Sequence, residues 1–377
     1  MRPEAPSPAA APQAHTRLLA VYAHVAHGHD PVRWARDWAS GALVGFNERS
    51  PYGYHRADDM GARVTFSTSH AEGALARLVR GGLRVALGFD IVHAWRNRAA
   101  LTACDVVWTH TESQHLAVLA VLALTRPSRA PKVIAQSVWL IDEWDRIGPL
   151  RQALATRLIA GADVLTFLSP LNAARAQAMW PHKRCEFVRF GVTCALKAAP
   201  KIQAPQTIHV LSVGNDRHRD WATLVSAFAG EPSVALTIAS RTAPRALAAG
   251  HHNVTIAAPA TQEELDALYR MADVFVLPLE PNLHASGVTV LQEAALFGLP
   301  VVATRAGGLE GYFTTEEACF VAPHAPQAMR DAVRTLFADD AARTRLAARL
   351  QARMRDDDLS STAYVARHVA LSRELVG

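Results

Sequence analysis

The sequence predicts an α/β protein made of two Rossmann-like domains that face each other across a cleft. Short β-branched runs alternate with helical stretches over nearly the whole chain, which is typical of parallel sheets covered on both faces. With 377 residues, 50% of them hydrophobic, the chain is also too long for one domain of the usual size. Ligands bind beyond the carboxyl ends of parallel strands, so two such sheets place a site between the domains.

The first domain is expected over residues 16–195, behind a flexible Pro/Ala tail over residues 1–15. Runs rich in β-branched residues indicate its strands. These strands are expected at Arg17–Ala23, Arg63–Phe66, Asp105–Thr109, Lys132–Ala135, Asp163–Leu168 and Glu186–Phe190. Helical spacing of apolar residues indicates helices at Pro31–Phe46, Glu72–Val79, Gln114–Leu124 and Leu150–Ala160.

Residues 196–206 contain Pro, Ala and Lys without hydrophobic periodicity and are expected to form the linker. The second domain is expected over residues 207–360, and residues 361–377 form a helix that could return to the first domain. The second domain's strands are expected at Ile208–Val213, Val234–Ala239, Val254–Ala257, Val274–Pro278 and Leu299–Ala303. Its helices are expected at Trp221–Phe228, Glu263–Met271 and Gly287–Phe297.

Positive charge is concentrated in the first half of the chain. Residues 1–200 carry 23 Lys and Arg against 15 Asp and Glu, a net +8, whereas residues 201–377 carry 16 against 19, a net −3. A basic half of this kind can attract an anionic membrane surface or a phosphorylated substrate. Nucleic acid is not an expected partner, because the sequence has no dense basic run interleaved with aromatic residues.

The chain shows no membrane-spanning or secretory pattern. Its longest apolar run, Leu116–Leu124, is about half of what a membrane-spanning helix needs. A signal-peptide pattern is absent, and the four cysteines have neither paired nor metal-ligand spacing. We therefore expect a cytoplasmic protein, peripheral on the inner face of the cytoplasmic membrane.

The segment over residues 273–308 is the most informative part of the chain. A buried strand ends at Pro278, and Ser286 and Gly287 then open a helix. The free backbone N–H groups at such a helix start can accept an anionic phosphate. Glu293 lies further along this helix, where its carboxylate could accept both hydroxyls of a ribose. The alternative is an ordinary surface glutamate.

This segment, with its "LQEA", "FGLPVVAT" and "AGG" runs, closely resembles the nucleotide-binding segment of glycosyltransferase family 4 and its GT-B relatives. The resemblance implies a GT-B fold and a nucleotide-sugar donor, a UDP-sugar or GDP-sugar, with no cofactor and no metal. It implies that Ser286 and Gly287 contact the donor diphosphate and that Glu293 binds the ribose. His284 and Val288 complete the donor-binding residues expected here.

The turn after the first strand of the second domain supports the same interpretation. Gly214 is followed by "NDRHRDW", and family members carry a basic residue here that neutralises the diphosphate. Arg219 is the first choice for this role and Arg217 the second; the alternative is a solvated Arg-rich turn. Many members also have a sugar-contacting glutamate eight positions before the ribose glutamate. That position is Ala285 here, and Glu280 is a weak substitute.

Candidates for the catalytic base follow the strand Lys132–Ala135. The histidine usual in retaining family members is absent, and Asp142, Glu143 and Asp145 stand among large apolar residues. A carboxylate in partly apolar surroundings gains the basicity needed to accept a hydroxyl proton. A looser likeness to xanthan glucuronosyltransferases, inverting GT-B enzymes acting on a lipid-linked acceptor, places the base at Asp142, with Glu143 next. The alternative is that these acids only solvate a helix start.

The acceptor is expected at the loop after the first strand. Gly28 can let a ligand approach the backbone, His27 and His29 could contact the acceptor, and Asp30 is a further candidate base. His24 with His27 and His29 lacks the remaining ligands of a metal site.

The acceptor itself is expected to be a saccharide or lipid-linked saccharide of polysaccharide biosynthesis. Two other functions remain open: a nucleotide-sugar epimerase, and a nucleotide-sugar-binding protein without turnover.

Overall fold

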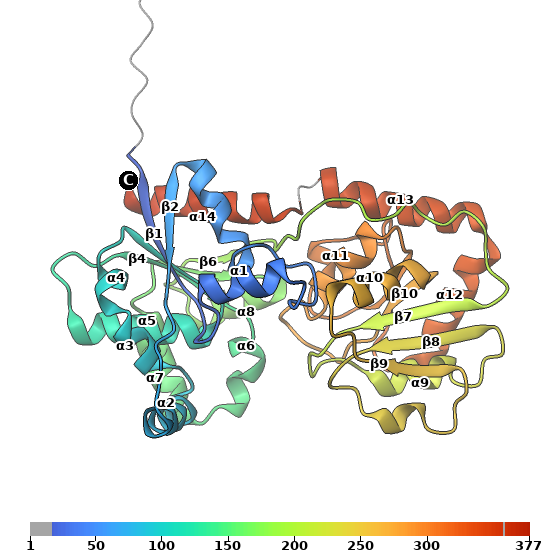
Figure 1. The fold of residues 1–377 in the computed structure, drawn as a ribbon, viewed down its shortest axis with the longest axis horizontal. Helices are drawn as coiled ribbons and strands as arrows, with labels where there is room; N and C mark the ends of the chain where they lie inside the picture. The colour runs from blue at the N-terminus through green and yellow to red at the C-terminus, as the bar shows by residue number, and fades with distance from the viewer. Residues whose placement is uncertain (1–16, 357–358) are drawn as a thin grey trace, which may run out of the picture.

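The computed structural model describes residues 17–356 and 359–377 and contains two six-stranded parallel sheets, each in its own half of the molecule (Figure 1). The first sheet has the order β2-β1-β3-β4-β5-β6 and the second β12-β11-β10-β7-β8-β9. The predicted fold class is therefore confirmed; the expected tail over residues 1–15 lies outside the described residues.

The strands follow the expected β-branched runs to within a few residues, except the last strand of the second sheet, Cys319–Val321, which the sequence pattern does not predict. The first sheet contains β1 (Leu19–His24), β2 (Ala62–Phe66), β3 (Val106–Thr109), β4 (Lys132–Ser137), β5 (Val164–Phe167) and β6 (Cys185–Phe187). The second contains β7 (Ile208–Val213), β8 (Val234–Ala239), β9 (Val254–Ala257), β10 (Val274–Leu277), β11 (Val301–Thr304) and β12 (Cys319–Val321). Because the strands are parallel, their carboxyl ends meet at one edge of each sheet.

Helices cover both faces of the sheets. The first half contains α1 (Pro31–Ala39), η1 (Pro51–Met60), α2 (Ala74–Leu87), α3 (Ile91–Arg96), α4 (Arg98–Thr102), α5 (Glu112–Thr125), α6 (Leu140–Glu143), η2 (Trp144–Arg146), α7 (Pro149–Ile159) and α8 (Pro170–Met179). The rest contains α9 (Trp221–Phe228), η3 (Arg245–Ala248), α10 (Gln262–Met271), α11 (Val288–Leu296), η4 (Leu309–Gly311), α12 (Pro326–Ala338), α13 (Asp340–Asp356) and α14 (Ser361–Val376). No helix within these described residues is both long and apolar enough to cross a bilayer.

The helix expected over Pro31–Phe46 ends early, at Ala39. Gly41 and Gly45 adopt left-handed conformations, which interrupt a helix and suit glycine. The following segment, Val44–Asn47, instead packs against the second half of the molecule, where Val44 and Phe46 contact its core.

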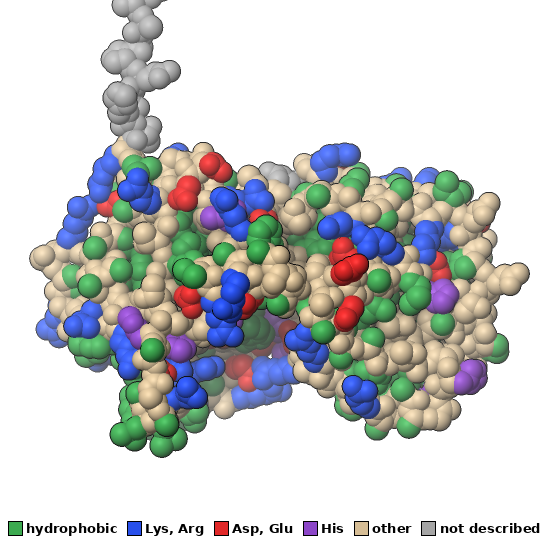
Figure 2. Space-filling model, viewed as in Figure 1, with side chains coloured by type: hydrophobic (Ala, Val, Ile, Leu, Met, Phe, Trp, Pro, Cys, Tyr) green, Lys and Arg blue, Asp and Glu red, His purple; other side chains and the backbone are tan. Residues whose placement is uncertain are grey.

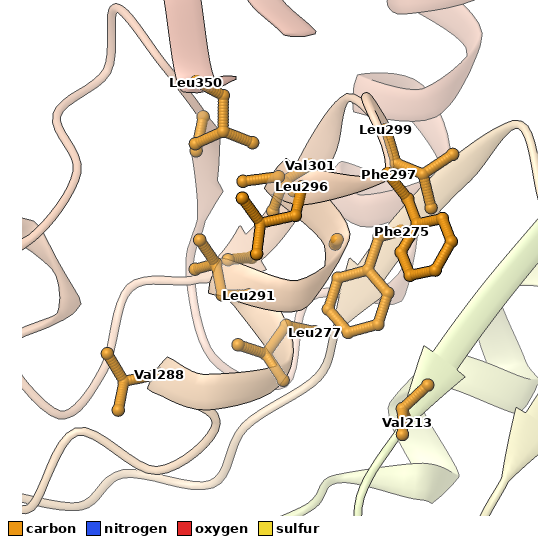
Figure 3. Packing of buried hydrophobic residues seen from close by; sticks show 14 of the residues in the cluster. Val213, Phe275, Leu277, Val288, Leu291, Leu296, Phe297, Leu299, Val301 and Leu350 are labelled. Carbon is orange, nitrogen blue, oxygen red and sulfur yellow. The ribbon is translucent and has the colours of Figure 1, made fainter. Parts of the chain in front are cut away.

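The core of the second half is built around α11. Its buried Leu291 and Leu296 pack against Leu277 of β10 and Val301 of β11 (Figure 3). Gly287, which precedes α11, has φ 83°, and a Cβ there would lie 2.7 Å from a methyl carbon of Leu277. Only glycine fits this close approach of helix and strand.

The last helix, α14, packs on the first sheet although it follows the second in sequence. Tyr364 and Val369 join the core beneath β1 and β3, and Trp108 donates a hydrogen bond from its indole nitrogen to the Ser372 hydroxyl over 2.8 Å. The chain passes between the halves twice, and the two passages lie side by side: Val192 pairs with Ser360, and Ser361 donates to the Val192 carbonyl over 3.0 Å.

Candidate active site

A buried guanidinium lies at the carboxyl end of β7. Arg219 is 8% exposed; it donates to the Ser286 hydroxyl over 2.6 Å and to the Val213 carbonyl over 3.3 Å. A Cβ on Gly214 would collide with the guanidinium, so glycine is required there. Burial lowers the pKa of Arg219 to about 10. Within the described residues no carboxylate forms an ion pair with Arg219. A buried cation without an ion-pair partner favours an anionic ligand.

The start of α11 adjoins this guanidinium. Gly287 occupies the N-cap position, and no side chain caps the helix. A Cβ on Gly287 would lie 3.2 Å from the Arg219 guanidinium. Uncapped N–H groups and a positive helix end therefore lie beside a buried cation, with Val288 as the first helical residue, an arrangement suited to a diphosphate.

Glu293 lies on the same helix but already has protein partners. Its carboxylate accepts one hydrogen bond from the Phe46 N–H over 2.9 Å and another from the Tyr269 hydroxyl over 2.8 Å. Gly45 of the same segment donates to the Gln262 side chain over 2.7 Å. Burial raises the pKa of Glu293 to about 7, although both hydrogen bonds act against the rise. A ribose could reach Glu293 only after Val44–Asn47 withdraws.

His284 joins the two halves of the molecule. Its Nδ1 lies 2.7 Å from Asp142 of the first half, and its Nε2 lies 3.1 Å from Asp216. Asp142 also accepts a hydrogen bond from the Leu283 N–H over 2.7 Å. Burial would lower the pKa of His284, but the bonds to Asp142 and Asp216 raise it above its usual value. The imidazole is thus held between two carboxylates.

Arg217 and Glu143 make a second contact across the cleft. Their side chains form an ion pair and line, with Trp139, Asn215 and Asp216, a pocket of about 580 Å³. Figure 2 shows the surface hollowed between the two halves. Arg217 is thus engaged with the first half, and Arg219 is the better placed of the two arginines for a phosphate.

The loop after β1 forms a separate cavity in the first half. His24, His27 and His93 line it together with Arg84 and Asp90, and its volume is about 70 Å³. Among the residues that the structure describes, the buried His24 Nδ1 and His27 Nε2 have no hydrogen-bond partner. Burial lowers the pKa of His24 to about 3 and that of His93 to about 4, so both rings are neutral.

The other residues expected in this loop lie outside the cavity wall. His29 packs against Trp34, with ring centroids 5.5 Å apart, and Asp30 caps α1 by accepting from the Arg33 N–H over 3.1 Å. Gly28 has φ 91° and donates to the Ser69 hydroxyl over 2.7 Å. Asp30 thus caps a helix of the first half, whereas Asp142 and Glu143 contact residues of the second half across the cleft.

Known proteins resemble both the sequence and the fold. Residues 184–339 match the family model described as glycosyl transferases group 1. This part of the chain is therefore similar to group 1 glycosyl transferases. D-inositol 3-phosphate glycosyltransferase of Corynebacterium glutamicum (strain R) is 38% identical over 89 residues, 23% of this chain and 21% of that protein. The same enzyme of Pseudarthrobacter chlorophenolicus is 34% identical over 126 residues, 32% of this chain and 29% of that protein. The matches thus span a fifth to a third of these curated relatives.

Solved structures extend the similarity of fold from residues 184–339 to nearly the whole chain. Sucrose-phosphate synthase from Thermosynechococcus elongatus superposes with a TM-score of 0.71 at 19% identity, covering 95% of this chain and 99% of that one. HepE from Anabaena, in complex with UDP-glucose, superposes with a TM-score of 0.64 at 12% identity, covering 93% and 99%. The predicted GT-B fold is confirmed.

Two clusters of this GT-B protein have residue types that could hold a cation, with ligand atoms within 4.8 Å of one another. They are Asp142, His218 and His284, and Asp220, Glu280 and His324. In the first cluster a cation would have to displace the His284 proton, because both ring nitrogens face carboxylates. Glu280 pairs with His324 over 3.2 Å.

Sequence reasoning missed several residues of the site. Asp216, His93 and Tyr269 touch the candidate residues, yet only Asp216 has a signal, since it lies in the same turn as Arg219. Phe46 was assigned to a helix and instead reaches Glu293 through its backbone. Backbone contacts of this kind carry no sequence signal.

Proposed function

We propose that this GT-B protein transfers a sugar from a nucleoside-diphosphate donor to a hydroxyl of a saccharide or lipid-linked saccharide. The observation that carries the proposal is the buried Arg219 guanidinium, which donates to the Val213 carbonyl and the Ser286 hydroxyl beside the start of α11. The diphosphate is the leaving group, and its charge increases as the bond to the sugar breaks. Arg219 and the helix N–H groups would stabilise that charge.

In the proposed reaction the acceptor oxygen attacks the anomeric carbon, and the bond from that carbon to the diphosphate oxygen breaks. The hydroxyl proton passes to Asp142, whose carboxylate is oriented by His284 and the Leu283 N–H. Glu293 would bind the ribose once the Val44–Asn47 segment has withdrawn. The cavity around His24 and His27 is the proposed acceptor subsite, since it lies at the carboxyl end of β1.

We further propose that the protein works as a peripheral protein at an anionic membrane, in polysaccharide biosynthesis. The +8 of residues 1–200 belongs to the half that contains the acceptor cavity. Each Lys or Arg near such a surface contributes about 1 kcal/mol, and the attraction fades within a Debye length.

Thermal denaturation with UDP, GDP and their sugar conjugates tests the donor. A ligand at about 100 times its Kd should stabilise the fold by about 2.7 kcal/mol. Arg219→Gln should abolish the stabilisation, whereas Arg245→Gln, an exposed arginine of the same domain, should retain it. Failure of every nucleotide to stabilise the wild type would refute the donor site.

Donor consumption with and without a lipid-linked saccharide separates the candidate activities. A transferase releases nucleoside diphosphate and elongates the acceptor. Conversion of the donor sugar without acceptor would identify an epimerase, and binding without turnover a non-catalytic protein.

A further inference from the structure

Helix α2 (Ala74–Leu87) has no buried residue, although six of its 14 residues are Leu or Val. Leu75 is 74% exposed, Leu78 73% and Val85 74%. In Figure 2 hydrophobic side chains gather at the lower left, where Figure 1 places α2. A monomeric soluble protein rarely leaves a continuous apolar patch of this kind uncovered.

Helix α2 differs from an ordinary surface helix in that most of its leucines are exposed while one of its three arginines, Arg80, faces the protein. Arg80 faces the protein: its side chain is 13% exposed and forms ion pairs with Glu72 and Asp90 over 2.9 and 2.7 Å. Leu87 is the apolar residue of α2 that packs on the core. An ordinary amphipathic helix buries its leucines and exposes its arginines; α2 is fixed by an arginine and presents leucines outward.

Positive charge surrounds the exposed leucines. Arg77 and Arg84 are exposed on the same helix, which contains no acidic residue. Arg151 of α7 donates to the carbonyls of Val85 and Ala86 at the end of α2, and the neighbouring Leu150 is also exposed. This combination matches the interface of an anionic bilayer, where leucines enter the acyl boundary and arginines meet phosphate groups. A second copy packed on α2 through a twofold axis would instead bring like charges together.

We propose that α2 is the element by which the protein inserts into the interface of an anionic membrane. A helix of 14 residues is about 21 Å long and too short to span a bilayer, so it lies in the membrane plane. Arg84 of α2 and Asp90 just after it also line the cavity with His24 and His27. The membrane contact therefore lies next to the proposed acceptor subsite, which a lipid-linked saccharide could enter without leaving the bilayer.

The inference deepens the proposed function but does not require transfer activity. Co-sedimentation with vesicles of phosphatidylglycerol and phosphatidylcholine tests it. The wild type should pellet with these vesicles and far less with phosphatidylcholine alone. Leu75→Ser with Leu78→Ser should lower the partition coefficient about tenfold or more, since two apolar side chains no longer leave water. Arg77→Glu should weaken binding mainly at low salt.

Ile202→Ser is the matched control, because Ile202 is an apolar residue that is 72% exposed outside α2. This variant should bind vesicles like the wild type. Equal pelleting of the double variant and the wild type would overturn the inference, as would an equal loss with Ile202→Ser. A third result would also overturn it: light scattering that finds the wild type dimeric and the double variant monomeric, while neither protein binds vesicles.

UDP affinity measured on the same samples keeps the two proposals apart. The double variant should bind UDP like the wild type. Vesicle binding by a wild type that binds neither UDP nor GDP would refute the donor site and leave the role of α2 standing.

Discussion

Replacing Glu293 with Gln should raise stability and weaken nucleotide binding at once. The Glu293 carboxylate is buried against Phe46 and Tyr269, and burial raises its pKa from 4.5 to about 7. The folded state therefore binds more protons than the unfolded state between these values, so stability falls as pH rises from about 4.5 to 7. At 1.36 kcal/mol per pKa unit, the ionised group lowers stability at pH 8 by about 3 kcal/mol. A neutral amide of the same shape avoids this loss.

Denaturant unfolding near pH 5 and pH 8 measures the effect. Glu293→Gln should match the wild type at the lower pH and exceed it by up to about 3 kcal/mol at the higher one. UDP affinity should fall by about 1.5–3 kcal/mol, because a ribose diol loses a charged acceptor. Glu263→Gln, on the exposed face of α10, is the control. The same pH dependence in wild type and Glu293→Gln would refute the buried-carboxylate argument, and unchanged UDP affinity would remove the ribose role.

Three further predictions follow from the cleft. Asp142→Asn should leave donor affinity nearly intact and reduce nucleoside-diphosphate release about 10²-fold or more; near-normal turnover would assign the base to another residue. Gly287→Ala should destabilise the fold by about 1–3 kcal/mol, because its Cβ would lie 2.7 Å from Leu277; an unchanged melting temperature would contradict this packing. The pKa of His284 is raised above 6.5, so its stabilisation is complete below about pH 6.5 and is lost as pH rises through the folded value. His284→Asn should flatten the wild-type decline in unfolding free energy on the alkaline side; an unchanged decline would show that another group causes it.

The sheets could be predicted because buried parallel strands are continuous β-branched runs, as at Ile208–Val213, which the structure reproduces without a shift. Helix α13 was missed, because its many arginines conceal the few positions, such as Leu350 and Met354, that face the core. Within the site, Arg219 could be proposed from its turn and a family resemblance. The partners of Asp142 could not, since they come from the other half of the molecule through folding.

The paired passages at Val192 and Ser360–Ser361 determine how the two halves can move. Both passages lie side by side, so a rotation of one half against the other would use a single hinge at that place. The contacts of Phe46 with Glu293 and of Asp142 with His284 are noncovalent. These contacts stabilise the present orientation of the two halves. A ligand that replaces them would favour a different orientation without unfolding either half.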